Sequence, residues 1–595
     1  MEINKRLLKL RILMENHGID IYYVPSSDYH QSEYMCDYFK TRRFISGFGG
    51  SAGTVVVTKD KAGLWVDGRY FIQAARDIAG TGIELYKMGE SKVPTTTEFI
   101  VSEIKENGTL AFDGKVASID TIKEIENMLN GKKINIIAKY DLIGEIWKNR
   151  PEIKFTEAFI LDEKYTGESF KDKIKRIKEE MLKKKANYHV VTSLDDIAWI
   201  FNLRGHDIKN SPVNLAYALI SMNRTVLYID ETKLNDKVKD YLMKNNIVIR
   251  DYNDIYREAV ELQSQNILID KIKVNYYLYE ILKEKNKIIF ADNPSVLMKA
   301  CKNKVEIENT RDAHLKDAVA CTKFMYWFKK QVKENKNIEK ISELDISDKI
   351  LEFRKEQKGY IEPSFDTIPA VGANAPMMHY RPTPERHDNL KLGKLLLIDS
   401  GAQYDNGTTD VTRTFAIGNI DNKLKEHFTL VLKGMLSLSK VKFLYGITGT
   451  NLDVLARAPI WKYGIDYKSG TGHGMGFVLN VHEGPHRIAP TYNSQKLEDG
   501  MIVSNEPGIY IEDSHGIRIE NILLVQKAEN TAFGQFMVFE TLTLVPIDLD
   551  CMLPDLLDSE EKEFLNKYHK IVYNKVSKYL LEDEREWLKE YTREI

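Results

Sequence analysis

The chain has 595 residues, of which 43% are apolar, 10% aromatic and 29% charged. At roughly 100–200 residues per domain this length corresponds to about three or four domains, and the composition is that of a globular protein. Because 85 Lys and Arg residues accompany 87 Asp and Glu residues, the formal charge is only -2, which leaves no basic excess for nucleic-acid phosphates. No apolar run approaches the ~20 residues of a membrane span. We therefore expect neither a nucleic-acid nor a membrane partner.

Residues 1–14 interrupt every apolar pair with charges, so they lack the apolar stretch of a secretory signal and predict an amphipathic helix ending near Gly18. The cysteines form no Cys-x-x-Cys pair, which argues against a disulfide framework and against a thiolate metal site. They are Cys36, Cys301, Cys321 and Cys551. The sequence therefore favours the reducing cytoplasm.

Residues 1–157 alternate strand-like runs with amphipathic helices, the pattern of an α/β domain. Residues 158–302 repeat the same rhythm over a similar length, which suggests a structural repeat. The strands expected in the first segment are 19–24, 54–58 and 134–137, and the second segment has an expected helix at 171–181 and strands at 189–192 and 225–229.

Residues 303–595 have a different pattern of predicted helices and strands. Two long helical patterns, 304–332 and 341–357, precede a region dense in Gly, Thr and short strands. After Pro554 the apolar residues return at helical spacing, and Asp558 and Glu561 are placed like a capping box. We expect a docked C-terminal helix. The predicted class is α/β (α+β), with domains at 1–157, 158–302 and 303–595.

The segment 47–52 matches the Gly-x-Gly-x-x-Ala fingerprint of dinucleotide-binding proteins, and Asp67 lies where its ribose-binding acid would be. That fingerprint must open a helix, whereas Thr54-Val-Val-Val57 is a strand pattern. No phosphate-binding loop with Gly-Lys-Ser/Thr is present either. Nucleotide chemistry is therefore not expected.

Two hairpins in the last segment carry acids on apolar strands. A turn at 404–407 sets Asp399 and Asp410 roughly opposite each other, and a turn beginning at residue 513 does the same for Glu506 and Glu520. Between them, glycines frame His473 at the end of what we expect to be an exposed backbone segment. Facing carboxylates repel unless a proton or a cation lies between them.

Each of these residues alone has an ordinary structural explanation, as a turn former, a solvated acid or a hydrogen-bonded histidine. Four acids in two similar hairpins with one Gly-framed imidazole are not explained that way. Four carboxylates and one imidazole suit two hard or borderline divalent ions such as Mn²⁺, with Co²⁺, Zn²⁺ or Fe²⁺ as alternatives.

The order and spacing of Asp399, Asp410, His473, Glu506 and Glu520 resemble the pita-bread metallopeptidases, and the surrounding strings resemble the three-domain, cytosolic-type Xaa-Pro aminopeptidases (aminopeptidase P). The strings in the last segment are 399–404, 407–414, 479–485 and 516–521. Further strings at 46–53, 65–70 and 193–205 are similar to that family's first and second domains, which are creatinase-like. The resemblance thus covers nearly the whole chain.

The resemblance implies a dinuclear site in which Asp399 chelates one ion, His473 and Glu506 hold the other, and Asp410 and Glu520 bridge. A water or hydroxide between the ions would be the nucleophile, with Glu506 as proton acceptor. His379 and His482 match the family's substrate-side imidazoles, which hydrogen-bond the substrate and move protons.

Three more residues are expected at the substrate. Tyr510 and Arg518 are within a few residues of ligands, and Arg69 matches a first-domain arginine that reaches the substrate in related enzymes, across a dimer interface in one interpretation. Ser469 departs from the family pattern, because related enzymes usually have His there; a hydroxyl cannot carry a positive charge near neutral pH.

The predicted activity is hydrolysis of the first peptide bond in peptides with proline second, in the cytoplasm, and the resemblance implies a homodimer. Two alternatives remain open on the same fold. One is a prolidase that takes Xaa-Pro dipeptides, although prolidases are usually shorter; the other is a metal-free binding protein, against which the complete ligand set weighs.

Overall fold

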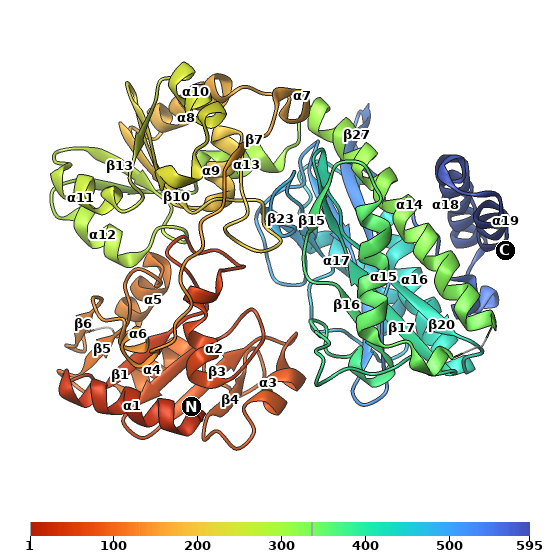
Figure 1. The fold of residues 1–595 in the computed structure, drawn as a ribbon, viewed down its shortest axis with the longest axis horizontal. Helices are drawn as coiled ribbons and strands as arrows, with labels where there is room; N and C mark the ends of the chain where they lie inside the picture. Colours follow the sequence, from red (N-terminus) through yellow and green to blue (C-terminus); the bar gives the residue numbers. More distant parts are fainter. Residues whose placement is uncertain (1, 130, 335–336) are drawn as a thin grey trace. The chain divides into compact units, whose positions relative to one another are not determined.

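The computed structural model describes residues 2–129, 131–334 and 337–595. It divides into two compact units, Met1–Glu163 with Glu168–Val296, and Lys164–Gly167 with Leu297–Ile595 (Figure 1). Both units mix helices and strands, in agreement with the predicted α/β (α+β) class. All four cysteines are free thiols.

The first half of the first unit is a six-stranded sheet in the order β4-β3-β2-β1-β5-β6, with β1 and β3 antiparallel to β2 and the outer strands parallel to their neighbours. Its strands are β1 (Ile21–Val24), β2 (Thr54–Thr58), β3 (Ala62–Val66), β4 (Glu84–Lys87), β5 (Thr109–Ala111) and β6 (Asn135–Ile137). Its helices are α1 (Ile3–Asn16), α2 (Thr41–Ser46), α3 (Phe71–Asp77), α4 (Thr96–Glu103), α5 (Ile119–Leu129) and α6 (Leu142–Ile146). The predicted N-terminal helix is thus present, with Met1 outside the described residues. The Gly-rich segment leads into strand β2, so the dinucleotide fingerprint lacks its helix.

The second half of this unit has the same sheet order and the same strand directions, β12-β11-β10-β8-β13-β14. Its strands are β8 (Tyr188–Val191), β10 (Ala216–Ser221), β11 (Thr225–Ile229), β12 (Ile247–Arg250), β13 (Asn266–Ile269) and β14 (Lys287–Phe290). Its helices are α8 (Phe170–Lys183), α9 (Leu194–Phe201), α10 (Asp236–Lys244), α11 (Asp254–Glu261), α12 (Tyr276–Lys283) and α13 (Pro294–Ala300), of which the last continues into the second unit. The predicted repeat is confirmed as a repeat of topology.

The two halves meet through equivalent loops. Ser118, after β5, pairs with Asn275, after β13. The amide of Ile119 donates to the Val274 carbonyl, and the amide of Tyr276 donates to the Ala117 carbonyl. Each bond is the counterpart of the other, so the halves are related locally by a two-fold arrangement, as the subunits of a symmetric dimer are.

The second unit places long helices over short, mainly antiparallel sheets. The helices are α14 (Lys304–Glu334), α15 (Glu343–Lys355), α16 (Asn422–Ser439) and α17 (Gly449–Trp461). The smaller principal sheet has the order β16-β17-β20 and consists of β16 (Ile368–Val371), β17 (Lys394–Ser400) and β20 (Val411–Ile417). The larger sheet has the order β21-β28-β27-β24-β22-β23 and consists of β21 (Phe443–Leu444), β22 (Gly472–Gly474), β23 (Glu483–Ile488), β24 (Ile502–Asn505), β27 (Asn521–Thr531) and β28 (Gly534–Thr541). A core that includes Phe324, Phe415 and Leu432 packs α14 and α16 against the smaller sheet. A second core, which includes Val503 and Leu523, lies on the larger sheet. These two cores fix the strands that carry the candidate ligands.

The C-terminal segment forms two helices where the sequence predicts one. Helix α18 (Ser559–Val576) starts with the predicted capping box of Asp558 and Glu561, and a 3-10 turn at Ser577–Tyr579 separates it from α19 (Glu582–Tyr591). The Arg585 guanidinium donates to the carbonyls of Ser577 and Leu580. The break is therefore stabilised by a side chain that satisfies the carbonyls exposed there.

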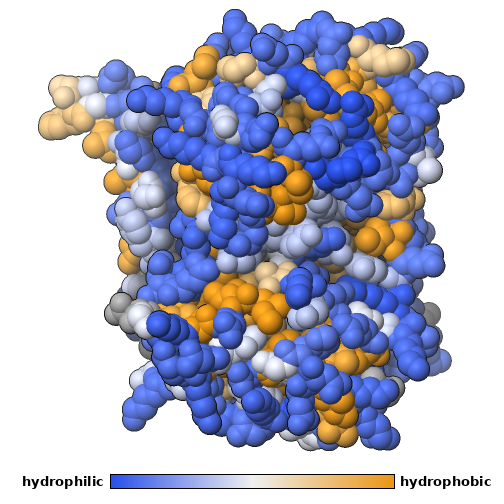
Figure 2. Space-filling model, turned by 90° about the vertical axis from the view of Figure 1, so that its left-hand side faces the viewer, coloured by the Kyte–Doolittle hydropathy of each residue, from blue (hydrophilic) through white to orange (hydrophobic). Residues whose placement is uncertain are grey.

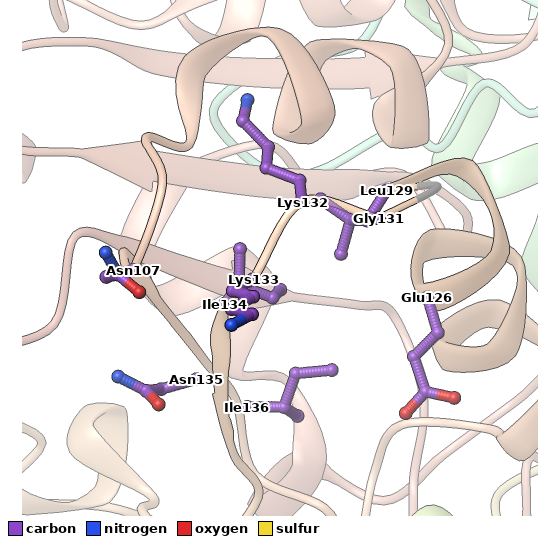
Figure 3. A pocket seen from close by; sticks show the side chains of 9 residues that line it. All are labelled: Asn107, Glu126, Leu129, Gly131, Lys132, Lys133, Ile134, Asn135 and Ile136. Atoms are coloured by element: carbon purple, nitrogen blue, oxygen red, sulfur yellow. The ribbon is translucent and has the colours of Figure 1, made fainter.

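Among the described residues, no helix combines the length and the hydropathy that crossing a bilayer requires. The face of the molecule in Figure 2 is largely hydrophilic, with apolar patches between the polar regions. A pocket of about 530 Å³ lies beside β6 in the first unit, and its Lys132 turns away to donate to the Val101 carbonyl (Figure 3). Its lining is Asn107, Glu126, Leu129, Gly131, Lys132, Lys133, Ile134, Asn135 and Ile136. The pocket holds none of the predicted site residues.

Candidate metal centre

Two antiparallel strands carry the first pair of acids. Strand β17 (Lys394–Ser400) contains Asp399, and Asp410 immediately precedes β20 (Val411–Ile417). Their register pairs Asp399 with Thr412, so Asp410 lies two residues from the facing position. Side chains two residues apart on a strand share a face. The hairpin therefore places Asp399, Asp410 and Thr412 together, with Thr412 in the position directly opposite Asp399.

The second pair of acids lies where one ladder passes into the next. Strands β24 (Ile502–Asn505) and β27 (Asn521–Thr531) pair Asn505 with Asn521, and β25 (Gly508–Ile511) and β26 (His515–Arg518) pair Gly508 with Arg518. The pairing continues from one ladder to the next without a shift, so Glu506 lies opposite Glu520, as the sequence spacing predicts.

His473 lies on β22 (Gly472–Gly474) inside the large sheet, between β23 (Glu483–Ile488) and β24. A Cβ on Gly472 would lie 1.9 Å from the Ser504 carbonyl oxygen, and one on Gly474 would lie 2.1 Å from that of Glu483. The expectation of an exposed segment is therefore wrong. The glycines are needed because neighbouring backbones approach too closely for any side chain.

These elements bring four of the five predicted ligands to one place. Donor atoms of Asp410, His473 and Glu520 all lie within 4.8 Å of one another. The His473 Nε2 atom is 3.5 Å from Asp410 Oδ2 and 3.4 Å from Glu506 Oε1. This convergence of carboxylates on one imidazole is the arrangement that a cation would stabilise.

Arg518 connects the fifth residue to the group. Its Nη2 atom donates to Asp399 Oδ2 at 2.5 Å, and its Nε atom lies 3.9 Å from Glu506 Oε2. Arg518 also donates to the Tyr510 hydroxyl at 2.7 Å and to Thr412 Oγ1 at 3.1 Å. Its guanidinium thus holds candidate ligands and a neighbouring tyrosine.

The titration of the cluster reflects crowded negative charge. Burial raises the pKa of Asp410 to about 6, with the charges of Asp399 and Glu506 adding to the effect and His473 opposing it. Burial and the same carboxylates raise the pKa of Glu520 as well. Burial disfavours the charged form of His473, but Asp410 and Glu506 outweigh it and raise its pKa to about 9. The group holds protons where ions would otherwise balance the charge.

Three observations test whether these residues fit metal ions. Among the described residues, the buried Oδ1 atoms of Asp399 and Asp410 have no hydrogen-bond donor. The Nδ1 atom of His473 donates to the Gly474 carbonyl at 2.9 Å, which leaves Nε2 directed at the acids. Metal-binding histidines are held in this way. Carboxylate oxygens and one imidazole also form a donor set for hard or borderline divalent ions. The residues fit.

Two hydroxyls that the sequence analysis did not single out orient the acids. Thr412 Oγ1 donates to Glu520 Oε2 at 2.9 Å, and Ser504 Oγ donates to Glu506 Oε1 at 3.0 Å while accepting from the His473 amide. Each lies two residues from a candidate ligand along its strand, so period-two spacing was the available signal.

The remaining predicted residues have different surroundings. The His482 ring meets the His473 ring edge to face, with centroids 4.2 Å apart. His379 is half-buried in the loop that follows β16 (Ile368–Val371). Ser469 is half-buried, and its carbonyl accepts from Arg457. Arg69 belongs to the first unit, where Asp67 accepts two hydrogen bonds from its guanidinium.

Family models match most of the chain. The description "Metallopeptidase family M24" matches residues 308–527, and "Creatinase/Prolidase N-terminal domain" matches 6–139 and, in a second form, 149–306. The C-terminal region of M24 peptidases matches 535–595. The candidate ligands all lie within the first of these ranges.

Similar proteins extend over the full length. Aminopeptidase P2 of Arabidopsis thaliana is 38% identical over 634 aligned positions, covering 100% of this chain and 89% of that protein. Xaa-Pro aminopeptidase 1 of Dictyostelium discoideum is 37% identical, covering 96% and 93%. Both alignments therefore extend over nearly the whole length of the chains that they compare.

Two solved structures are informative. X-prolyl aminopeptidase from Caenorhabditis elegans, described as a cytosolic enzyme with a di-nuclear active site, has a TM-score of 0.95 at 33% identity and covers 100% of both chains. Xaa-Pro dipeptidase from Bacillus anthracis has a TM-score of 0.51 at 25% identity and covers 64% of this chain and 99% of its own. With this likeness over its whole length, the chain belongs to the Xaa-Pro aminopeptidases (aminopeptidase P) of metallopeptidase family M24.

Proposed function

We propose that this protein is a two-metal Xaa-Pro aminopeptidase, which releases the first amino acid from peptides whose second residue is proline. The observation that carries the proposal is the convergence of Asp410, His473, Glu506 and Glu520, with Asp399 joined through Arg518, in a chain that matches aminopeptidases over its full length. The dipeptidase structure corresponds to only part of the chain, which favours an aminopeptidase over a prolidase.

Asp399 would chelate one ion, His473 and Glu506 would hold the other, and Asp410 and Glu520 would bridge the two. Four carboxylate charges balance two divalent ions. The preponderance of oxygen donors with one imidazole favours Mn²⁺, and Co²⁺, Zn²⁺ and Fe²⁺ are the alternatives. The orphaned Oδ1 atoms of Asp399 and Asp410 are the acceptors that such ions would satisfy.

When bound, the two ions supply Lewis-acid activation of a water nucleophile and of the scissile carbonyl. Glu506 accepts a proton from the attacking water through a carboxylate that Ser504 orients by donating to Oε1. Arg518 fixes Asp399 by a charge-assisted hydrogen bond, and Thr412 fixes Glu520. These hydrogen bonds thereby fix the orientation of the Glu506, Asp399 and Glu520 carboxylates before the substrate binds.

His379 and His482 bind the substrate backbone and carry a proton to the leaving group. His482 lies beside the cluster, packed edge to face on His473. Arg69 contributes a guanidinium toward a peptide carbonyl or carboxylate. Tyr510, held by Arg518, supplies aromatic surface near the second substrate residue, and Arg518 is the remaining substrate-side candidate.

The proline specificity follows from peptide chemistry. An Xaa-Pro bond has no N–H, and the ring fixes φ near about -65°. A peptidase that relies on that donor or on an extended substrate strand cannot hold such a bond. A dedicated pocket with an aromatic wall and an imidazole can.

We further propose three domains, at 1–157, 158–302 and 303–595, which the family matches at 6–139, 149–306 and 308–527 support. The enzyme acts in the cytoplasm, as the Caenorhabditis elegans enzyme is described to do, and as a homodimer by family resemblance. Light scattering of the purified protein tests the dimer.

Metal titration tests the proposal directly. Protein stripped with a chelator should regain hydrolysis of an Xaa-Pro-Xaa tripeptide as Mn²⁺ is added, with a break at two ions per chain by calorimetry. A break at one ion per chain with full activity would contradict the dinuclear assignment. Absence of both binding and activity would favour a non-catalytic binder.

A further inference from the structure

Glu343, the first residue of α15, is a buried carboxylate that the chemistry above does not use. Its two oxygens accept hydrogen bonds from four donors. The Val371 amide and the Asn374 side chain donate to Oε1 at 2.7 and 3.0 Å. The Tyr380 hydroxyl and the Asp388 amide donate to Oε2 at 2.7 and 2.8 Å. The side chain has no exposed surface.

These four donors come from both ends and the middle of one loop. The loop leaves β16 at Val371 and returns at Asp388, whose carbonyl accepts from the Glu343 amide. Asn374 also donates to the Asp388 carboxylate at 2.8 Å, which joins the two ends directly. Loops without such anchors are mobile. Here the Glu343 carboxylate accepts hydrogen bonds from the loop, in place of the backbone hydrogen bonds that would hold a strand in a sheet.

The same loop packs against the hairpin of the candidate metal centre. A Cβ on Gly516, in β26, would lie 2.4 Å from the Ala375 carbonyl oxygen. Only glycine permits this approach. Strand β26 also carries Arg518, so the loop is in contact both with Glu343 and with the hairpin that holds Arg518.

His379 lies inside this loop, next to Tyr380. We propose that Glu343 is a positioning residue for the peptidase reaction, which acts by holding the loop so that His379 meets the substrate. The inference rests on the proposed function of His379. Glu343 itself touches neither the candidate metal ligands nor the substrate in this proposal.

Glu343→Gln tests the inference with a minimal change of shape. Glutamine keeps one acceptor oxygen and puts an NH₂ group where the other was. In either orientation this NH₂ faces a backbone amide, of Val371 or of Asp388, which can only donate. One loop end therefore loses its anchor. Since small displacements of catalytic groups are costly, kcat should fall about 10- to 100-fold.

Metal binding separates this effect from damage to the centre. Glu343→Gln should bind two Mn²⁺ ions with unchanged affinity by calorimetry. Tyr380→Phe, which removes one of the four donors, should show a smaller fall in kcat of a few fold. Asp558→Ala is the stability control: it removes the N-cap of α18 in the same unit, which lowers the stability of the fold, and should leave kcat unchanged.

A double-mutant cycle with His379→Ala decides the question. If Glu343 acts through His379, Glu343→Gln should have no further effect on kcat in the His379→Ala background. Independent effects that multiply, or an unchanged kcat in Glu343→Gln alone, would overturn the inference. If His379→Ala itself were fully active, the proposed role of His379 would fail, which is a distinct outcome.

Discussion

Asp410, Glu520 and His473 hold protons more tightly in the folded, metal-free chain than they would in an unfolded one. The pKa of Asp410 rises from 3.8 to about 6, that of Glu520 also rises, and that of His473 rises from 6.5 to about 9. Raised values mean that the folded state binds more protons, so stability falls as pH rises through this range. The contribution of His473 to the stability of the folded state is complete below pH 6.5 and is lost as the pH rises past about 9.

We therefore predict that the metal-free protein loses thermal stability between pH 5 and pH 9, whereas the Mn²⁺-loaded protein loses much less. Two dications replace the protons as the balancing charge, and protons compete less for the ligands at high pH. Differential scanning calorimetry with and without chelator should show a difference in Tm that widens with pH. A difference that narrows would contradict the assignment.

Asp410 and His482 should respond differently to removal. Asp410→Ala deletes a proposed bridging ligand and should abolish both metal retention and turnover. His482→Ala should keep both ions and lose mainly kcat, by about 10²-fold or more. Metal content by mass spectrometry and steady-state kinetics distinguish them. Retention of both metal and activity in Asp410→Ala would disprove its bridging role.

At the scale of single elements, strand β22 shows why the sequence places His473 between glycines. Gly472→Ala forces a Cβ to within 1.9 Å of the Ser504 carbonyl oxygen, so we expect destabilisation of about 1–3 kcal/mol. Gly470→Ala is the matched control, because its Cβ would meet its nearest neighbours at an ordinary 3.4 Å. Equal stability of the two variants by chemical denaturation would contradict this explanation.

Arg413 on β20 links the centre to the C-terminal helices. It donates to the carbonyls of Glu520, Val545 and Pro546 and to the Tyr568 hydroxyl of α18. Arg413→Lys cannot reach all these acceptors, so the backbone of Glu520 should loosen and Mn²⁺ affinity should fall. Tyr568→Phe removes only one partner and should lower stability by about 1 kcal/mol without changing that affinity. Calorimetric titration of both variants tests this, and unchanged affinity in Arg413→Lys would disprove the link.

The sequence predicts these elements well where a pattern repeats along one strand or helix. The long helices α14 and α15, the strands β2 and β11 and the Asp558 capping box follow from local spacing, and the register of Glu506 and Glu520 follows from their distance to the turn. What local spacing does not contain is contact between distant segments. The roles of Arg413 and Glu343 depend on partners that are far away in the chain, so the sequence around them carries no signal for these roles.

At the scale of the whole molecule, the repeat in the first unit could be inferred only from its rhythm. The two sheets share order and strand directions, but a buried strand requires only apolar residues of suitable shape. Their sequences are therefore free to diverge. The symmetric pairing of Ser118 with Asn275 shows the duplication more directly than any residue pattern does.

The proposed reaction of the whole chain is removal of the first residue before proline from peptides longer than two residues. The most direct measurement is mass spectrometry of the products that the purified, Mn²⁺-supplemented protein releases from an Xaa-Pro-Xaa tripeptide and, separately, from an Xaa-Pro dipeptide. We predict release of the first amino acid from the tripeptide with little cleavage of the dipeptide. Cleavage of the dipeptide alone would make the protein a prolidase, and cleavage of neither would contradict the assignment as a peptidase.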